Sequence, residues 1–203
     1  MKKQILLLVI LFSLNGTFGQ DKMKVKFSNG EVMIGEFEIK RFYQQNTHLI
    51  YKKNKMKYDL DFINNVIVIN GKDSTKFHVI STKKYKKSKK IIKRLGVKKL
   101  TGENIELFYV PTTIHSFGFG FGFGGMMNTV ASESSEAFLK RTNDKIAYNM
   151  GYLFGVGQRG IKKRVREYFT DCPKLIALVN KNKIRKKNTF AIADYYEKNC
   201  GDK

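Results

Sequence analysis

Two Asn-Gly pairs, at residues 29–30 and 70–71, are each flanked by segments in which apolar and polar residues alternate. Asn-Gly provides the two positive-φ positions of the tight turn that joins antiparallel strands, and alternation is the pattern of a strand with one buried face. These signals predict one hairpin over residues 23–41 and another over 65–80. A third hairpin, over residues 48–62, is predicted around a Lys-Asn-Lys turn. Three consecutive hairpins indicate an antiparallel meander that is either curled into a small barrel or lies flat on a helix.

Residues 1–19 have the pattern of a signal peptide. Two lysines precede an apolar run at 5–14 that is too short to span a membrane, and small residues follow as far as Gly19. The alternative, a buried apolar strand or helix, would require the two lysines to be accidental. Cleavage before Gln20 leaves no cysteine near the new N-terminus, so we expect no lipid anchor. We expect export to the periplasm, to the periphery of the outer membrane or to the medium.

The chain carries a large excess of positive charge. Its formal net charge is +22 at pH 7, and loss of residues 1–19 would remove two lysines and lower it to +20. Such an excess attracts nucleic acid, anionic lipid headgroups, lipopolysaccharide or acidic glycans. The basic residues are 32 lysines and 7 arginines, and lysine lacks the planar fork with which arginine reads bases. We therefore expect attraction to polyanions without sequence-specific recognition of nucleic acid; the alternative is a solvated charge that reflects lysine-rich codon usage.

The densest basic run covers residues 83–99, with ten lysines or arginines and no acid. Ser88 is a suitable N-cap, the apolar residues that follow it fall on one helical stripe, and Gly96 is placed to end a helix. We therefore predict a basic loop that leads into a short amphipathic helix, docked on the sheet. An acidic partner would be bound mainly through counterion release. The candidate contacts with a polyanion are Lys83, Lys84, Lys86, Lys87, Lys89, Lys90, Lys93 and Arg94.

A segment rich in glycine and phenylalanine, residues 114–131, interrupts the predicted strands and contains the sequence FGFGFGFGG. In an extended chain this alternation places the rings on one face and glycine on the other. One role is an apolar segment that docks on a bilayer, on a partner or on a second copy. The other is a mobile glycine-rich loop with some rings packed on the domain. The candidate docking residues are Phe117, Phe119, Phe121 and Phe123.

The same segment matches the G-x-G-x-x-G pattern of dinucleotide-binding proteins at Gly120, Gly122 and Gly125, with Asp144 at roughly the expected distance beyond. That pattern functions when it follows a strand of a parallel β-α-β unit. The chain before it is predicted to be hairpins, and an exported protein would rarely meet a dinucleotide. We therefore expect no nucleotide or other cofactor.

The remaining segments complete an α+β fold. A strand at 105–110 and a hairpin at 137–148 belong to the same β-rich domain, which we assign to residues 20–148. Residues 149–203 are predicted to be helical, because apolar residues recur there at helical spacing in three stretches. Pro173 suits the first turn of the second helix. The prediction is thus an antiparallel sheet domain followed by a bundle of about three helices.

Cys172 and Cys200 are the only cysteines of the chain. The first lies at the start of the second predicted helix and the second at the end of the third, so these ends are neighbours if the two helices are antiparallel. An exported protein with two cysteines so placed is expected to join them in a disulfide. A redox or nucleophilic thiol is the alternative, but the chain has neither a C-x-x-C pair nor a nearby histidine.

Candidate catalytic residues are few. Asp59 and Asp61 are two residues apart, which would place both carboxylates on the same side of one strand, where they could hold a cation or do acid and base work. Alternating polar residues are also the pattern of a solvated strand face. The histidines, His48, His78 and His115, fall in different predicted elements, so no metal site is expected. No motif of a serine hydrolase, nucleoside triphosphatase or zinc protease occurs.

Several segments resemble small secreted proteins of the Bacteroidota, chiefly of flavobacteria: the leader ending FGQ, and ENIELFYV, FLKRTNDKIAY, DCPKLIALVNKN and YYEKNC. The resemblance implies export across the inner membrane and supplies no catalytic residue. The basic run and the Gly/Phe segment are not features of that type. We expect a non-enzymatic binding module of the cell envelope, with an anionic envelope component, another envelope protein or the membrane periphery as its partner. The alternative is an envelope hydrolase that uses Asp59 and Asp61.

Overall fold

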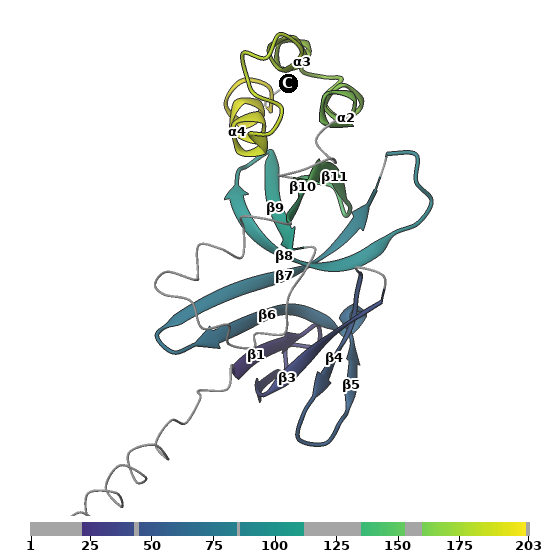
Figure 1. The fold of residues 1–203 in the computed structure, drawn as a ribbon, viewed down its shortest axis with the longest axis vertical. Coiled ribbons are helices and arrows are strands. Elements are labelled where there is room, and N and C mark those ends of the chain that lie inside the picture. Colours follow the sequence, from purple (N-terminus) through teal and green to yellow (C-terminus); the bar gives the residue numbers. More distant parts are fainter. Residues whose placement is uncertain (1–21, 43–44, 85, 112–134, 153–159, 202–203) are drawn as a thin grey trace, which may run out of the picture.

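The computed structural model describes residues 22–42, 45–84, 86–111, 135–152 and 160–201. It confirms the α+β class, with antiparallel sheets followed by three helices at the C-terminal end (Figure 1). The predicted signal peptide and the Gly/Phe segment lie outside the described residues. Within these ranges no helix is long and apolar enough to cross a membrane.

The N-terminal part of the large sheet consists of two hairpins joined along β1. Strands β1 (Lys22–Phe27) and β2 (Val32–Gly35) form the first, and β6 (Ile63–Asn70) and β7 (Asp73–Lys83) form the second. A turn forms at each Asn-Gly pair, with Gly30 at φ 93° and Gly71 at φ 59°, where glycine is favoured. The predicted positive φ of Asn29 and Asn70 is wrong, because only the glycine of each pair adopts it. β1 also pairs with β6, which gives the order β7-β6-β1-β2. Alternate residues of these strands enter a common core.

The predicted first hairpin, over residues 23–41, is wrong in its second half. The chain leaves the large sheet after Gly35, and β3 (Phe37–Phe42) pairs instead with β4 (Gln45–Tyr51), which in turn pairs with β5 (Lys57–Asp59), in a separate sheet. At the crossing, a Cβ on Gly35 would lie 2.6 Å from Cε2 of the Tyr51 ring. Phe37 is buried in the core between the two sheets. Burial of this ring therefore determines where the chain changes sheet.

The second half of the sheet closes into a small five-stranded barrel. β8 (Ile92–Thr101), β9 (Ile105–Pro111), β10 (Ser135–Arg141) and β11 (Ala147–Tyr152) continue the meander from β7, and the start of β11 then pairs in parallel with the end of β7. β7 and β8 are shared between the two halves, which is visible as the long curved strands in the middle of Figure 1. The barrel interior contains Ile80, Phe108, Val110, Phe138 and Ala147.

The helix predicted within residues 83–99 is wrong, because residues 92–101 form β8. This strand pairs with β7 on one side and with β9 on the other, so its backbone hydrogen bonds are made across the sheet. Leu95 is fully buried in the N-terminal core, whereas Gly96 faces the barrel. A Cβ on Gly96 would lie 3.2 Å from both Ile80 and Val110. Glycine at this position marks a close approach inside the barrel, not the end of a helix.

Three helices cover one face of β9, β10 and β11: α2 (Ile161–Tyr168), α3 (Pro173–Asn180) and α4 (Thr189–Asn199). β11 continues to residue 152, so the sheet extends past the predicted domain boundary at 148. Cys172 and Cys200 form the predicted disulfide, with an S–S distance of 1.95 Å. It joins the residue before α3 to the residue after α4.

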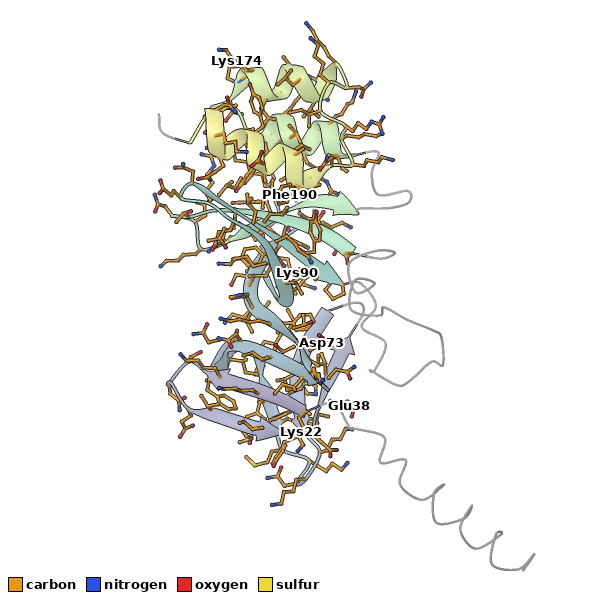
Figure 2. The ribbon with its side chains drawn as sticks, turned by 90° about the vertical axis from the view of Figure 1, so that its left-hand side faces the viewer. Lys22, Glu38, Asp73, Lys90, Lys174 and Phe190 are labelled. Carbon is orange, nitrogen blue, oxygen red and sulfur yellow. A yellow bond between two sulfur atoms is a disulfide. The ribbon has the colours of Figure 1, made fainter. Side chains whose placement is uncertain are left out.

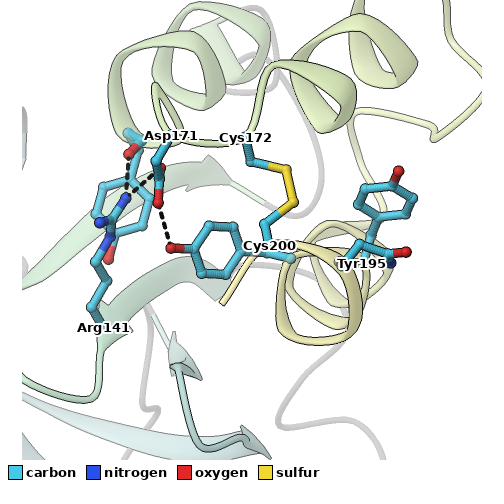
Figure 3. Close-up of a disulfide and its surroundings, with 8 residues drawn as sticks. Arg141, Asp171, Cys172, Tyr195 and Cys200 are labelled. Atoms are coloured by element: carbon cyan, nitrogen blue, oxygen red, sulfur yellow. Dashed lines mark hydrogen bonds and ion pairs between the residues drawn. A yellow bond between two sulfur atoms is a disulfide. The ribbon is translucent and has the colours of Figure 1, made fainter. Parts of the chain in front are cut away.

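A polar cluster beside the disulfide attaches the helices to the barrel (Figure 3). The Arg141 guanidinium, at the end of β10, donates hydrogen bonds to Oδ1 of Asp171 at 2.7 Å and to the carbonyl of Tyr168 at 3.2 Å. The Tyr196 hydroxyl donates to Oδ2 of the same carboxylate at 2.7 Å. Partial burial disfavours the Asp171 carboxylate, but the hydrogen bond from Tyr196 and the guanidinium of Arg141 outweigh it, so the pKa of Asp171 is lowered.

Candidate polyanion-binding surface

Most of the predicted polyanion contacts lie on the connection between β7 and β8. We call residues 83–93 the basic hairpin. Its base is fixed by the last ladder pair, Thr82 with Ile92, and by the Thr82 hydroxyl, which donates to the Ile92 carbonyl at 2.7 Å. Beyond that pair the connection extends sideways from the barrel, below α2 in Figure 1. The ordered base and the extended connection place the lysines away from the core.

The lysines of the connection are exposed. Lys86 donates to the carbonyl of Glu167 at the end of α2, at 3.3 Å, which holds the hairpin against that helix. Lys87, Lys89 and Lys90 make no ion pair with any carboxylate of the described chain. Lys84 is also exposed, and Lys83 is half-buried at the end of β7. Within the basic hairpin, the charge that no described carboxylate compensates is therefore concentrated at residues 87–90.

The outer side of α2 continues this positive surface. Arg166 lies exposed in the last turn of the helix, near the Glu167 carbonyl that Lys86 contacts. Lys163 is exposed as well, although its ammonium lies 4.0 Å from the Glu167 carboxylate. The contact between Lys86 and the Glu167 carbonyl thus brings α2 and the basic hairpin together.

Two of the eight predicted contacts, Lys93 and Arg94, are engaged with carboxylates inside the fold. Lys93 pairs with Asp61 at 2.8 Å and remains about one third exposed. Arg94 pairs with Glu136 at 2.5 Å, and both side chains are largely buried. Both cations are therefore paired within the protein. The predicted contacts that remain available to a partner are those on the connection between β7 and β8.

Arg94 belongs to a buried polar network that the sequence reasoning missed. Glu136 and Asn149 are 7% and 4% exposed, and the Asn149 amide donates to Oε1 of Glu136 at 2.8 Å. Oδ1 of Asn149 accepts from the Gly151 amide at 2.7 Å and from the Arg164 guanidinium. The network thus connects β8, β10, β11 and α2 at one end of the barrel. Glu136 and Asn149 lie just outside the predicted hairpin of residues 137–148, so the sequence pattern gave no signal for them.

The proposed catalytic pair does not have the predicted geometry. Asp59 ends β5, whereas Asp61 lies in a turn of 3-10 helix, Leu60–Phe62, so the two are not on one strand. Oδ1 of Asp59 accepts from the Asp61 amide at 2.9 Å and caps this turn, while the Asp61 carboxylate binds Lys93. Both carboxylates are exposed and have local structural partners.

The two histidines in the described part of the chain, His48 and His78, lie in different sheets. His78 lies on β7, edge-on to the Phe108 ring at 6.1 Å, and burial together with nearby Lys98 and Lys76 lowers its pKa. His48 lies on β4 in the separate sheet, and His115 is outside the described residues. Among the residues that the structure describes, no group of three His, Cys, Asp or Glu side chains is placed to hold a metal ion.

The four phenylalanines predicted as a docking element, Phe117, Phe119, Phe121 and Phe123, lie outside the described residues, as do the glycines of the G-x-G-x-x-G pattern. The strand before that pattern, β9, belongs to an antiparallel meander, which is not the parallel unit that a dinucleotide site requires. No family model, curated protein or solved structure matches the chain.

Proposed function

We propose that the protein is an exported, non-enzymatic binding module of the cell envelope, and that the basic hairpin is its contact with an anionic envelope component. The observation that carries this proposal is the exposure of Lys87, Lys89 and Lys90 without a carboxylate partner in the described chain. The neighbouring Lys93 and Arg94, by contrast, are neutralised by Asp61 and Glu136.

The chemistry of the hairpin favours a partner that is recognised by its charge density. Lysine ammonium groups are hydrated point charges that release counterions from a polyanion but do not read base edges. Tyr85 is the only aromatic residue in the sequence of the basic run at 83–99, which weakens the case for a platform that stacks on bases. Anionic lipids, lipopolysaccharide and acidic glycans meet these requirements.

Export is the second part of the proposal. The N-terminal signal pattern predicts it, and the Cys172–Cys200 disulfide supports it because such bonds persist in oxidising compartments. The carboxylate hydrolase that the sequence left open receives no support from Asp59 and Asp61, because one carboxylate caps a turn and the other is paired with a lysine.

Mixed-sequence duplex DNA serves as a generic polyanion for the test, because the salt dependence of binding to it counts the phosphate contacts. We expect the logarithm of the association constant to fall linearly with the logarithm of the salt concentration, with a slope of about 0.9 per contact. The variant Lys87→Gln/Lys89→Gln/Lys90→Gln should lower the slope by about 2 to 3. The matched control is Lys174→Gln/Lys181→Gln/Lys183→Gln, which removes three exposed lysines from the helical end.

Equal losses of slope in the hairpin variant and in the control would show that binding is spread over the whole basic surface. That result would contradict the hairpin as the contact. Binding that does not respond to salt at all would contradict an electrostatic mechanism altogether.

A further inference from the structure

A second basic surface lies on the outer face of the large sheet, away from the hairpin. The outward side chains of β2, β1, β6 and β7 form what we call the lysine–aliphatic face. Its charged and aliphatic members are Lys22, Lys24, Lys26, Val32, Ile34, Ile67, Ile69 and Lys76, and the register places Asn65, Ser74 and His78 on the same side. The inward residues of the same strands, among them Val25, Val66 and Phe77, form the N-terminal core, so the alternation of each strand determines which side chains face outward.

The register of the sheet places each lysine of β1 directly beside a β-branched aliphatic residue. Lys26 is opposite Val32, and Lys22 is opposite Ile69. One row crosses all four strands in the order Ile34, Lys24, Ile67, Lys76. Neighbouring strands are about 4.8 Å apart, so ammonium groups and aliphatic side chains alternate across the face at that spacing.

The aliphatic side chains of this face are unusually accessible. Val32 is 49% exposed and Ile34 is 60% exposed, and both lie on β2, the terminal strand of the eight-stranded sheet. Ile67 and Ile69 are half-buried between the lysine stems. No acidic side chain of these four strands points to the same side, as their alternation shows. The face is therefore positively charged and partly apolar.

This combination distinguishes between the partners that a basic surface could take. A second copy of the chain would bring the same lysines together, at a repulsive cost. An acidic glycan or a nucleic acid backbone would match the charges but would offer little to Val32 and Ile34. The interface of an anionic bilayer offers both, because it accepts small aliphatic groups while lysines extend their stems and hold their ammonium groups at the headgroups.

We propose that the lysine–aliphatic face binds anionic lipid bilayers peripherally, with Val32 and Ile34 entering the interface and Lys22, Lys24 and Lys26 contacting headgroups. This inference goes beyond the hairpin proposal and is carried by a different surface. The face lies at the opposite end of the molecule from the C-terminal helices: Figure 2 places Lys22 in the sheet end and Lys174 in the helical end. The helical end therefore supplies control positions.

The test is flotation of the exported protein with vesicles of phosphatidylcholine, with and without phosphatidylglycerol. The intact mass of the protein is measured first, to establish whether the leader has been removed. Val32→Thr/Ile34→Thr keeps β-branched residues in the strand and should lower affinity for the anionic vesicles about tenfold. Lys24→Gln/Lys26→Gln should lower it by about fivefold for each lysine. Phe190→Ser, which changes an apolar residue that is 44% exposed on α4, and Lys174→Gln/Lys181→Gln should leave it unchanged.

The results with these variants distinguish this proposal from the proposal that the basic hairpin is the contact. Binding of Val32→Thr/Ile34→Thr to duplex DNA should equal that of the unaltered protein, since DNA does not need the aliphatic side chains. Vesicle binding that is insensitive to both face variants, or that is abolished by the hairpin variant alone, would overturn the face proposal and leave the hairpin proposal standing. Failure to bind anionic vesicles above the phosphatidylcholine background would also overturn it.

Discussion

The pairing of Arg94 with Glu136 allows a quantitative prediction about stability. Their side chains are 15% and 10% exposed, so water screens the interaction poorly. Nε of Arg94 is buried without a hydrogen-bond partner in the described chain, which leaves the guanidinium dependent on Glu136. Glu136→Leu would remove the only carboxylate paired with this cation in the described residues and would also release the Asn149 amide. Breaking a buried ion pair in this way costs about 3 to 5 kcal/mol.

A double-mutant cycle tests this reasoning. Arg94→Met leaves the glutamate unpaired and should cost a similar amount, but Arg94→Met/Glu136→Leu replaces both charges by apolar groups. The double variant should therefore be no less stable than either single variant, with a coupling energy of about 2 kcal/mol or more. Urea denaturation followed by circular dichroism gives the four free energies of unfolding, those of the unaltered protein and of the three variants.

The control for the cycle is the exposed helical pair Asp194 and Lys198, whose side chains are 36% and 68% exposed. Asp194→Asn should change the free energy of unfolding by only about 0.5 kcal/mol. If the Arg94 and Glu136 changes add without coupling, then the buried pair does not exist as described, and the assignment of both residues to the barrel end is wrong.

Three further predictions concern the barrel and its helical cap. Reduction of the disulfide, or Cys172→Ser/Cys200→Ser, should lower the free energy of unfolding by about 3 to 4 kcal/mol in the loop-entropy model, measured by urea denaturation with and without reductant. Gly96→Ala should cost about 1 to 3 kcal/mol, because the added methyl group meets two barrel side chains at 3.2 Å, and a neutral result would contradict the tight barrel interior. The lowered pKa of Asp171 stabilises the fold above the ordinary carboxyl pKa, and this stability is lost as pH falls through the folded-state value. The Asp171→Asn variant should therefore have a lower free energy of unfolding near neutral pH and should lose less of it on acidification. Burial and the hydrogen bond to Asp171 also raise the pKa of Tyr196 to about 12.

Much of the fold could be predicted from local patterns. Asn-Gly at 29–30 and 70–71 formed turns at the expected places, and apolar residues at helical spacing marked α2, α3 and α4. The disulfide followed from the positions of its cysteines at two helix ends. The turns and helices depend on residues close together in sequence, which is why they could be recognised without a structure. The disulfide has a sequence separation of 28, but the chain has only these two cysteines.

The errors arose where distant residues decide the outcome. Residues 92–101 carry helix-like signals, but pairing with strands on both sides made them β8. Phe37 alternates with polar residues as a continuation of β2 would, yet a core formed with Tyr51 and Tyr58 takes it into another sheet. Closure of the barrel by β11 and β7 joins segments 65 residues apart, as in the pair of Thr82 with Ala147.

Only part of the candidate site could be predicted, because some of its contacts also join residues that are far apart in the sequence. Exposure of the lysines at 87–90 follows from their local density, whereas the engagement of Arg94 depends on Glu136, which is 42 residues away. The lysine–aliphatic face also required the register of four strands, since single-strand alternation shows a lysine row but not the aliphatic residues beside it.

The most direct test of the central claim is the fractionation of cells that produce the unaltered protein or the variant Lys87→Gln/Lys89→Gln/Lys90→Gln. We predict that the unaltered protein is recovered with the envelope fraction and is released by a high-salt wash, and that the hairpin variant shifts towards the free periplasm or medium. The variant with the helical-end lysines replaced should behave like the unaltered protein. Recovery of the unaltered protein free of the envelope at low salt, or an identical distribution of the protein and its hairpin variant, would contradict the account.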